Sequence, residues 1–128
     1  MRSWCGVLCS AFGASPDFGD AFEELALTIG LEPPSPFRHF IAREAGTPVA
    51  TCSLFLGGGV AGIYDVSTRP GFRRRGFGAL VTRRAMDEAR HLGYRIAILH
   101  ASALGVGVYR SLGFEDLCGI GQHVWIPQ

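Results

Sequence analysis

The sequence contains no lysine, and all 12 of its basic residues are arginine. This absence excludes Schiff-base chemistry, the lysine of a Walker-type phosphate loop, and any lysine that acts as general base or nucleophile. The 11 acidic residues bring the formal net charge to +1, so the chain has no general attraction for nucleic acid or membranes. Chemistry here must use arginine, backbone amides, carboxylates, histidine, tyrosine, serine or cysteine.

Long apolar runs and paired cysteines are also missing. No run approaches the roughly 20 residues that span a bilayer, and the segment 1–14 lacks the continuous apolar core of a signal peptide. The four cysteines are scattered; Cys5 and Cys9 lie four residues apart, which is not the spacing of a CxxC redox or zinc pair. The sequence therefore predicts a cytoplasmic protein with free thiols and no metal site.

The residues that are present suffice for one domain. The 128 residues are 48% hydrophobic and 18% charged, so they can bury a core, and they leave no room for a second domain. Helical spacing predicts helices over 2–12 and from the Ser15-Pro16-Asp17 start signal to Gly30. The prolines that follow predict a loop. Residues 1–36 are expected to form a helical N-terminal part of a domain that covers 1–128.

The hydrophobic period changes after residue 36. Alternation predicts an antiparallel meander of strands over 37–44, 49–56 and 60–68. A helix over 76–92 and a strand over 95–102 then complete a crossover unit, whose two strands are expected to be parallel. The fold class is α/β or α+β with a mixed sheet.

Side-chain burial and the end of the chain can also be predicted. The helix over 76–92 is expected to bury Leu80, Val81, Ala85, Ala89 and Leu92. A short helix is expected over 106–112, and the tail 114–127 can supply one or two final strands. Aromatic side chains of this size are usually core residues, which predicts that Trp4 and Trp125 are buried.

The most informative segment lies between the strand over 60–68 and the following helix. A loop at such a junction offers unpaired backbone N–H groups and the positive end of a helix dipole, which suits a phosphate or pyrophosphate. Gly76 and Gly78 allow close approach of a ligand, and the run Arg73-Arg74-Arg75 can add charge-assisted hydrogen bonds. The segment therefore predicts an anion-binding site.

Two motifs in this region resemble those of the GCN5-related N-acetyltransferase (GNAT) superfamily. The segment Arg73-Arg74-Arg75-Gly76-Phe77-Gly78 resembles the Arg/Gln-x-x-Gly-x-Gly/Ala motif that binds acetyl-CoA, and Pro70 stands at the usual place upstream. The segment 102–114 resembles Asn-x-x-Ala-x-x-x-Tyr-x-x-x-Gly-Phe. In that segment Tyr109, Gly113 and Phe114 match, whereas Ser102 and Gly105 replace Asn and Ala.

The resemblance implies a fold and a site. The fold would be a mixed, mostly antiparallel sheet with a parallel β-α-β acetyl-CoA unit, and residues 37–128 would form the cofactor-binding core. Pantetheine would lie along the strand end, the pyrophosphate on the motif, and the thioester near the second motif, where Tyr109 would be the acid for the leaving thiolate. The implied cofactor-binding residues are Val66, Ser67, Thr68, Arg73, Arg74, Arg75, Gly76, Phe77, Gly78, Ala79, Ser102 and Tyr109.

The activity that the resemblance implies is transfer of an acetyl group from acetyl-CoA to an amine of a small molecule or protein by direct attack. The alternative is a non-catalytic acyl-CoA-binding or accessory domain of the same fold. A third interpretation, a nucleic-acid adaptor using the arginine run, lacks the interleaved aromatics and basic balance typical of such proteins.

The general base stays open at the level of the sequence. The candidates are Asp65, Tyr64, His100, Glu44 and His39, or a chain of water molecules without a single base. Strand alternation places Tyr64 on one face and Asp65 on the other, so both cannot point at the substrate.

The N-terminal side departs from the family pattern. The superfamily fold usually opens with a strand, and this chain begins with what the spacing predicts to be helices. Without that strand the segment 37–44 would be an exposed sheet edge. We therefore expect a homodimer or a companion domain at this edge.

Overall fold

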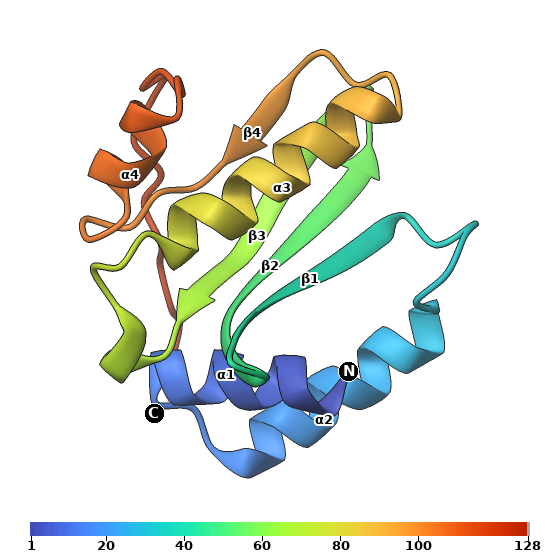
Figure 1. The fold of residues 1–128 in the computed structure, drawn as a ribbon, viewed down its shortest axis with the longest axis vertical. Helices are drawn as coiled ribbons and strands as arrows, with labels where there is room; N and C mark the ends of the chain where they lie inside the picture. Colours follow the sequence, from blue (N-terminus) through green and yellow to red (C-terminus); the bar gives the residue numbers. More distant parts are fainter. Residues whose placement is uncertain (128) are drawn as a thin grey trace.

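The structure is a computed structural model that describes residues 1–127. A four-stranded sheet carries one long helix on one face and two helices on the other (Figure 1). The elements, in chain order, are α1 (Arg2–Phe12), α2 (Pro16–Ile29), β1 (Phe37–Glu44), β2 (Thr47–Gly57), β3 (Val60–Thr68), a 3-10 turn η1 (Pro70–Phe72), α3 (Phe77–His91), β4 (Ala97–Leu99) and α4 (Val106–Ser111).

The strands lie in the order β1-β2-β3-β4. The first three form the expected antiparallel meander, and β4 pairs with β3 in parallel. This confirms the mixed, mostly antiparallel sheet with a parallel crossover. Within residues 1–127, β1 is an edge strand of the sheet. The partner expected at that edge stays a prediction.

Local sequence explains where the N-terminal helices begin and end. The Ser15 hydroxyl accepts a hydrogen bond from the Phe18 amide, and Pro16 occupies the first turn of α2, where a missing N–H costs nothing. Helix α1 ends at Gly13, whose φ of 66° is a left-handed conformation that favours glycine. These caps confirm the two predicted helices.

The larger core lies between the sheet and α3. Leu54 of β2 and Ile63 of β3 pack there against Val81, Ala85 and Ala89, which the sequence predicts correctly. The expectation for the two leucines of this helix is wrong, because Leu80 and Leu92 are 54% and 42% exposed. The face of α3 that packs on the sheet is narrower than predicted and runs through Val81, Ala85 and Ala89. Thr82 is the fourth buried residue of this helix.

A second, smaller core lies on the other face of the sheet, under α1. Trp4 is 3% exposed and packs with Cys5, Leu8 and Phe22, with Ile41 of β1 beneath it. Its indole nitrogen donates a hydrogen bond to the Cys52 carbonyl of β2 at 3.4 Å. Helix α1 is therefore docked on the meander by one aromatic side chain that is both apolar and a donor.

Three expectations for the C-terminal part are wrong. The strand predicted over 95–102 is only Ala97–Leu99, and residues 114–127 contain no strand. Trp125 lies in this tail and is 83% exposed, not buried. The physical reason is the short β4, which offers too few backbone groups for another strand to pair with.

The two tryptophans allow a test of how α1 is docked. We expect Trp4→Phe to lower the free energy of unfolding by about 1 kcal/mol, because it removes the donor to Cys52 and reduces buried area. The matched control Trp125→Phe should change it by less than about 0.5 kcal/mol. Urea denaturation of both variants measures the difference. Equal effects would contradict the docking role of Trp4.

Candidate functional site

The site begins where the sheet separates between β3 and β4. The parallel pairing covers only Ala61–Ile63 of β3 against Ala97–Leu99. Beyond this point, within residues 1–127, no strand lies beside β3 on that side, so its backbone over 64–68 is open along one edge. Unpaired backbone N–H and C=O groups of this kind can bind the amides of a ligand as a strand would.

A β-bulge marks the point of separation. Ser53 pairs with Tyr64 and Thr51 with Ser67, so one residue of β2 faces two residues of β3, Asp65 and its successor. Asp65 takes a φ of 54°, a left-handed conformation that aspartate tolerates better than most residues. The Thr51 hydroxyl holds the bulge by donating a hydrogen bond to the Asp65 carbonyl at 3.0 Å.

The bulge changes which side chains share a face. Ile63 before it and Val66 after it both pack in the core under α3. Tyr64 follows Ile63 and points to the opposite face, where the Asp65 carboxylate also lies, close to Ser53 and His39. The expectation that Tyr64 and Asp65 face opposite sides is therefore wrong, because the extra residue resets the alternation.

Three side chains on that face form a cluster under α1, the His39–Ser53–Asp65 cluster. The His39 Nδ1 atom lies 2.9 Å from the Ser53 hydroxyl. Burial raises the pKa of Asp65 from its ordinary value of 3.8, while the Ser53 hydrogen bond and the nearby His39 act in the opposite direction. Burial also lowers the pKa of His39. Ser53 is the member that sequence reasoning missed, since a serine in an apolar strand carries no sign of its partners.

The loop between β3 and α3 has the backbone geometry of an anion site. Gly76 precedes α3 with a φ of 84°, and α3 has neither a side-chain cap nor an acidic residue in its first turn. The first amides of the helix, from Phe77 to Ala79, therefore keep their donors for an external acceptor. An added Cβ on Gly78 would come no closer than 3.8 Å to another heavy atom, so the space beside it is open.

The three arginines of the motif have different partners. Arg73 donates to the carbonyls of Thr68 and of Ala11, at the C-terminal end of α1. Arg75 forms an ion pair with Glu44 at 2.5 Å and lies over the rings of Phe72 and Phe77.

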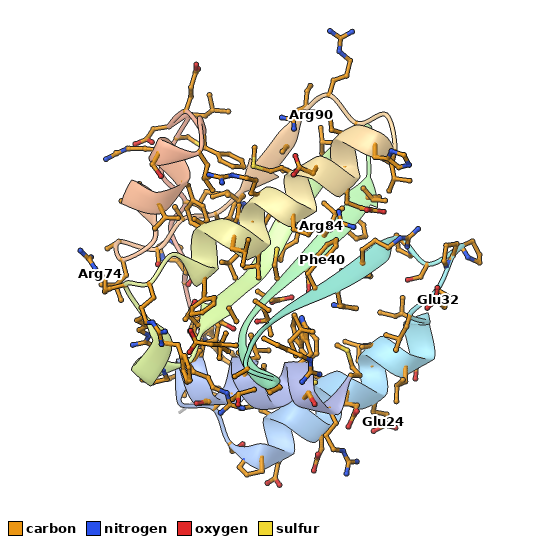
Figure 2. The ribbon with its side chains drawn as sticks, viewed as in Figure 1. Glu24, Glu32, Phe40, Arg74, Arg84 and Arg90 are labelled. Atoms are coloured by element: carbon orange, nitrogen blue, oxygen red, sulfur yellow. The ribbon has the colours of Figure 1, made fainter. Side chains whose placement is uncertain are left out.

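Arg74 has a φ of 62° and points away from the body of the protein (Figure 2). Among the described residues only this arginine of the three has no protein acceptor. The ion pair with Arg75 occupies the carboxylate of Glu44.

Tyr109 lies on α4 and is half-buried. Burial raises the pKa of its hydroxyl, with a smaller contribution from Cys52. Cys52 lies opposite the bulge, and burial together with the charge of Asp65 raises its own pKa to about 12. Cys52 therefore lies near both Asp65 and Tyr109, and the tyrosine stays protonated over a wide pH range.

The substitutions in the second motif fit this geometry. A Cβ on Gly105 would lie 2.9 Å from the Tyr109 ring, so glycine makes room for the tyrosine. The Ser102 hydroxyl accepts a hydrogen bond from the Gly105 amide at the start of the turn into α4. His100 lies beside Tyr64, with ring centroids 6.3 Å apart.

Two other kinds of site can be assessed from the geometry. No three His, Cys, Asp or Glu side chains among residues 1–127 come together in a way that could hold a metal ion. No helix in the same part of the chain has the length and hydropathy needed to cross a membrane.

Comparison with known proteins identifies the family. The model of the acetyltransferase (GNAT) family matches residues 8–114. A search of curated proteins finds no match to the sequence.

Solved structures share the fold at low sequence identity. Glucosamine-6-phosphate N-acetyltransferase from Arabidopsis thaliana is 18% identical, with a TM-score of 0.72 over 98% of this chain and 90% of its own. AAC(6')-Iy, solved with the bisubstrate analogue CoA-S-monomethyl-acetylneamine, is 19% identical, with a TM-score of 0.75 over 98% and 91%. A protein of Pyrococcus horikoshii assigned as an acetyltransferase is 22% identical, with a TM-score of 0.74 over 91% of this chain. This chain spans only 40% of that protein's length. The family match covers most of the sequence, and the chain belongs to the GNAT acetyltransferase family, whose fold serves acyl transfer from acetyl-CoA.

Proposed function

We propose that this protein is an N-acetyltransferase that transfers the acetyl group of acetyl-CoA to an amine of a small molecule or protein by direct attack. The observation that carries the proposal is the bulge in β3. It opens the backbone beside β4 and places the Asp65 carboxylate at the opening, on the side of the sheet that α1 covers. Tyr109 of α4 lies near Cys52, the residue of β2 that is opposite the bulge.

The residues present fit acetyl-CoA. The uncapped N-terminus of α3, free of carboxylates, and the exposed Arg74 suit the pyrophosphate. The open backbone over 64–68 suits the two amides of pantetheine. Of the residues expected to bind the cofactor, we assign Arg73 and Arg75 to shaping the loop, because protein acceptors already occupy their guanidinium groups.

Two residues supply the proton transfers in this proposal. Acetyl-CoA would provide the thioester whose carbonyl carbon the amine attacks. Asp65 takes a proton from the amine, a role for which a carboxyl with a raised pKa is suited. Tyr109 remains protonated and donates its proton to the departing thiolate. The pair Tyr64 and His100 lies at the edge of the same opening and could contact the acceptor.

We further propose that the protein is cytoplasmic and forms one domain, with a second copy or a companion domain at the β1 edge of the sheet.

The different partners of the motif arginines lead to different effects on cofactor affinity. We expect Arg74→Ala to weaken CoA binding about tenfold and to reduce its salt dependence, because it removes a charge-assisted contact to phosphate. Arg75→Ala is the matched control and should change affinity less than about twofold. Calorimetric titration with CoA at two salt concentrations measures both. Loss of affinity in Arg75→Ala alone would contradict the assignment.

Turnover separates the enzyme from a non-catalytic binding domain. We expect the wild type to bind acetyl-CoA and release thiol in the presence of a suitable amine from a panel of small and peptide amines. Tyr109→Phe should keep the affinity for acetyl-CoA within about twofold and lose about 100-fold in kcat, since general acid catalysis contributes about that much.

Three results would argue against parts of this proposal. A wild type that binds acetyl-CoA and acetylates no amine would favour the accessory domain. A folded wild type that binds no acetyl-CoA would overturn the proposal. A Tyr109→Phe variant as fast as the wild type would remove the tyrosine from its role.

The burial of Asp65 predicts a stability cost at neutral pH. The pKa of Asp65 is raised in the folded state, so folding favours the protonated carboxyl. The contribution of this carboxyl to stability is complete below its ordinary pKa of 3.8, and it is lost as the pH rises through the pKa of the folded state. We expect Asp65→Asn to be more stable than the wild type at about pH 7, with the difference disappearing near about pH 3, and to be inactive.

A carboxylate elsewhere in the chain provides the control for this effect. The pKa of Asp116 is lowered by its hydrogen bond to Arg110, so Asp116→Asn should not stabilise the protein at neutral pH. Urea denaturation across this pH range measures both variants. Equal stability of Asp65→Asn and wild type at about pH 7 would contradict the unfavourable burial.

A further inference from the structure

One face of the sheet is left partly uncovered beside the opening. On the side where α1 and α2 lie, α1 packs against β2 and β3, and among residues 1–127 neither helix packs extensively against β4. Figure 1 shows both helices crossing the lower end of the sheet, away from the start of β3 and from β4. The side chains at this end of the face are therefore available to a ligand.

Strand pairing places one row of residues on this uncovered face. Phe55 of β2 pairs with Phe37 on one side and with Gly62 on the other. Gly62 pairs in turn with Ile98 of β4. The residues before and after Gly62 and Ile98 pack in the core under α3, so alternation directs the row to the opposite face.

Tyr64 and His100 extend this row toward the bulge. Their rings meet edge to face, with centroids 6.3 Å apart at 88°. The ring of Tyr64 lies over Gly62, where an added Cβ would be only 2.5 Å from the nearest ring atom. Glycine at that position therefore makes room for the tyrosine ring. We name this surface the aromatic shelf; its residues are Phe37, Phe55, Gly62, Tyr64, Ile98 and His100.

The aromatic shelf exposes apolar groups next to the opening of the sheet. Tyr64 is 36% exposed and Ile98 is 37% exposed. Phe37 and Phe55 are half-buried, with ring centroids 4.9 Å apart. Asp65 directly follows Tyr64, at the point where β3 leaves β4. Contiguous apolar groups exposed at such a point are typical of a ligand-binding surface.

The scarcity of charge around the aromatic shelf limits the ligands that it can bind. In β2, β3 and residues 96–102, Asp65 is the only aspartate, glutamate, lysine or arginine. Arg38 of β1 is directed back at the carbonyls of Ser35 and Phe37, at 2.6 and 2.8 Å. A phosphate or carboxylate on a ligand would therefore lack an arginine partner here, although the chain contains 12 arginines. A polyamine would find one carboxylate for its several charges.

We propose that the acceptor is a primary amine on a flat apolar body, such as an arylalkylamine, and that the aromatic shelf binds this body. The inference rests on the proposed function and names its substrate class. The apolar body packs on Tyr64 and Ile98, and the single negative charge of Asp65 complements the single positive charge of the ammonium group. In the transfer, the N–C bond forms and the C–S bond of the thioester breaks. The ammonium ion loses two protons: one reaches solvent through Asp65, and the CoA thiolate gains the equivalent of the other through Tyr109.

The test compares three amines of different chemistry on the CoA-loaded protein. The probes are 2-phenylethylamine, spermidine and glucosamine 6-phosphate, which present an aromatic ring, several positive charges and a phosphate. Ligand-observed NMR titration measures the affinity of each probe without turnover. We expect 2-phenylethylamine to bind at least about tenfold more tightly than the other two, because only its body is apolar. It should also have the highest kcat/KM in thiol release from acetyl-CoA.

Substitutions on the aromatic shelf test the contact itself. Tyr64→Ala should weaken the binding of 2-phenylethylamine about tenfold, whereas Tyr64→Phe should keep it within about twofold, because the ring remains. Gly62→Ala should also weaken binding, because the added Cβ displaces the Tyr64 ring. Leu92→Ala is the matched control: this leucine is 42% exposed at the end of α3, and its loss should change nothing. The affinity of each variant for CoA reports that it is folded.

A charge introduced on the shelf should change the preference among the probes. We expect Ile98→Arg to weaken the binding of 2-phenylethylamine about tenfold and to strengthen that of glucosamine 6-phosphate, because the new guanidinium repels the ammonium group and attracts the phosphate. Sedimentation of this variant and of the wild type at several concentrations tests whether a second copy of the chain covers the shelf instead.

The outcomes separate this inference from the proposed function. Binding of 2-phenylethylamine that depends on Tyr64, without acetylation of any amine, supports the shelf as an apolar amine site and overturns only the proposed function. Acetylation with a preference for spermidine or glucosamine 6-phosphate would overturn the inference and leave the proposed function intact. Absence of saturable binding, or binding that Tyr64→Ala leaves unchanged, would also overturn the inference. A wild-type dimer that Ile98→Arg dissociates would assign the shelf to a second copy, with the same consequence.

Discussion

The site depends on one additional residue in β3. Between the pairs Ser53–Tyr64 and Thr51–Ser67 the strand contains two residues where β2 contains one, and Asp65 accommodates the excess with a positive φ. Such a backbone conformation costs on the order of 1–3 kcal/mol and persists only where its surroundings stabilise it. Here the stabilisation comes from the Thr51 hydroxyl, which donates to the Asp65 carbonyl and lies 2.5 Å from the Ser67 hydroxyl.

Both consequences of the bulge concern the same point in space. The strand turns away from β4 immediately after their three paired residues, which leaves its backbone open to a ligand. The reset alternation brings a carboxylate to the face under α1 while Val66 remains in the core under α3. The same bulge therefore opens the sheet and supplies the ionisable group, Asp65. A regular strand would provide neither.

Helix α1 ties the two ends of this site together. Its Trp4 donates to the Cys52 carbonyl opposite the bulge, and the carbonyl of Ala11 near its C-terminal end accepts from Arg73 in the loop before α3. A displacement of this helix would disturb the buried polar cluster and the anion-binding loop together. Because α1 also covers His39, water is kept away from the hydrogen bond between His39 and Ser53, whose strength depends on a low local dielectric.

The sequence predicts the features that depend on neighbouring residues. It does not predict the features that depend on contacts between distant residues. The helix caps at Ser15 and Gly30, the meander and the glycines of the loop before α3 depend on neighbours in the chain, and all were predicted from the sequence. A one-residue bulge has no signature when the residue in the left-handed conformation is an aspartate.

The three motif arginines look equivalent in the sequence, but Arg73 finds its acceptor 62 positions away and Arg75 finds Glu44 on β1. The positive φ of Arg74 then leaves only the middle guanidinium directed outward. A run of like charges can therefore identify an anion-binding loop without identifying which charge binds. The assignment follows from the tertiary contacts that occupy the guanidinium groups of Arg73 and Arg75.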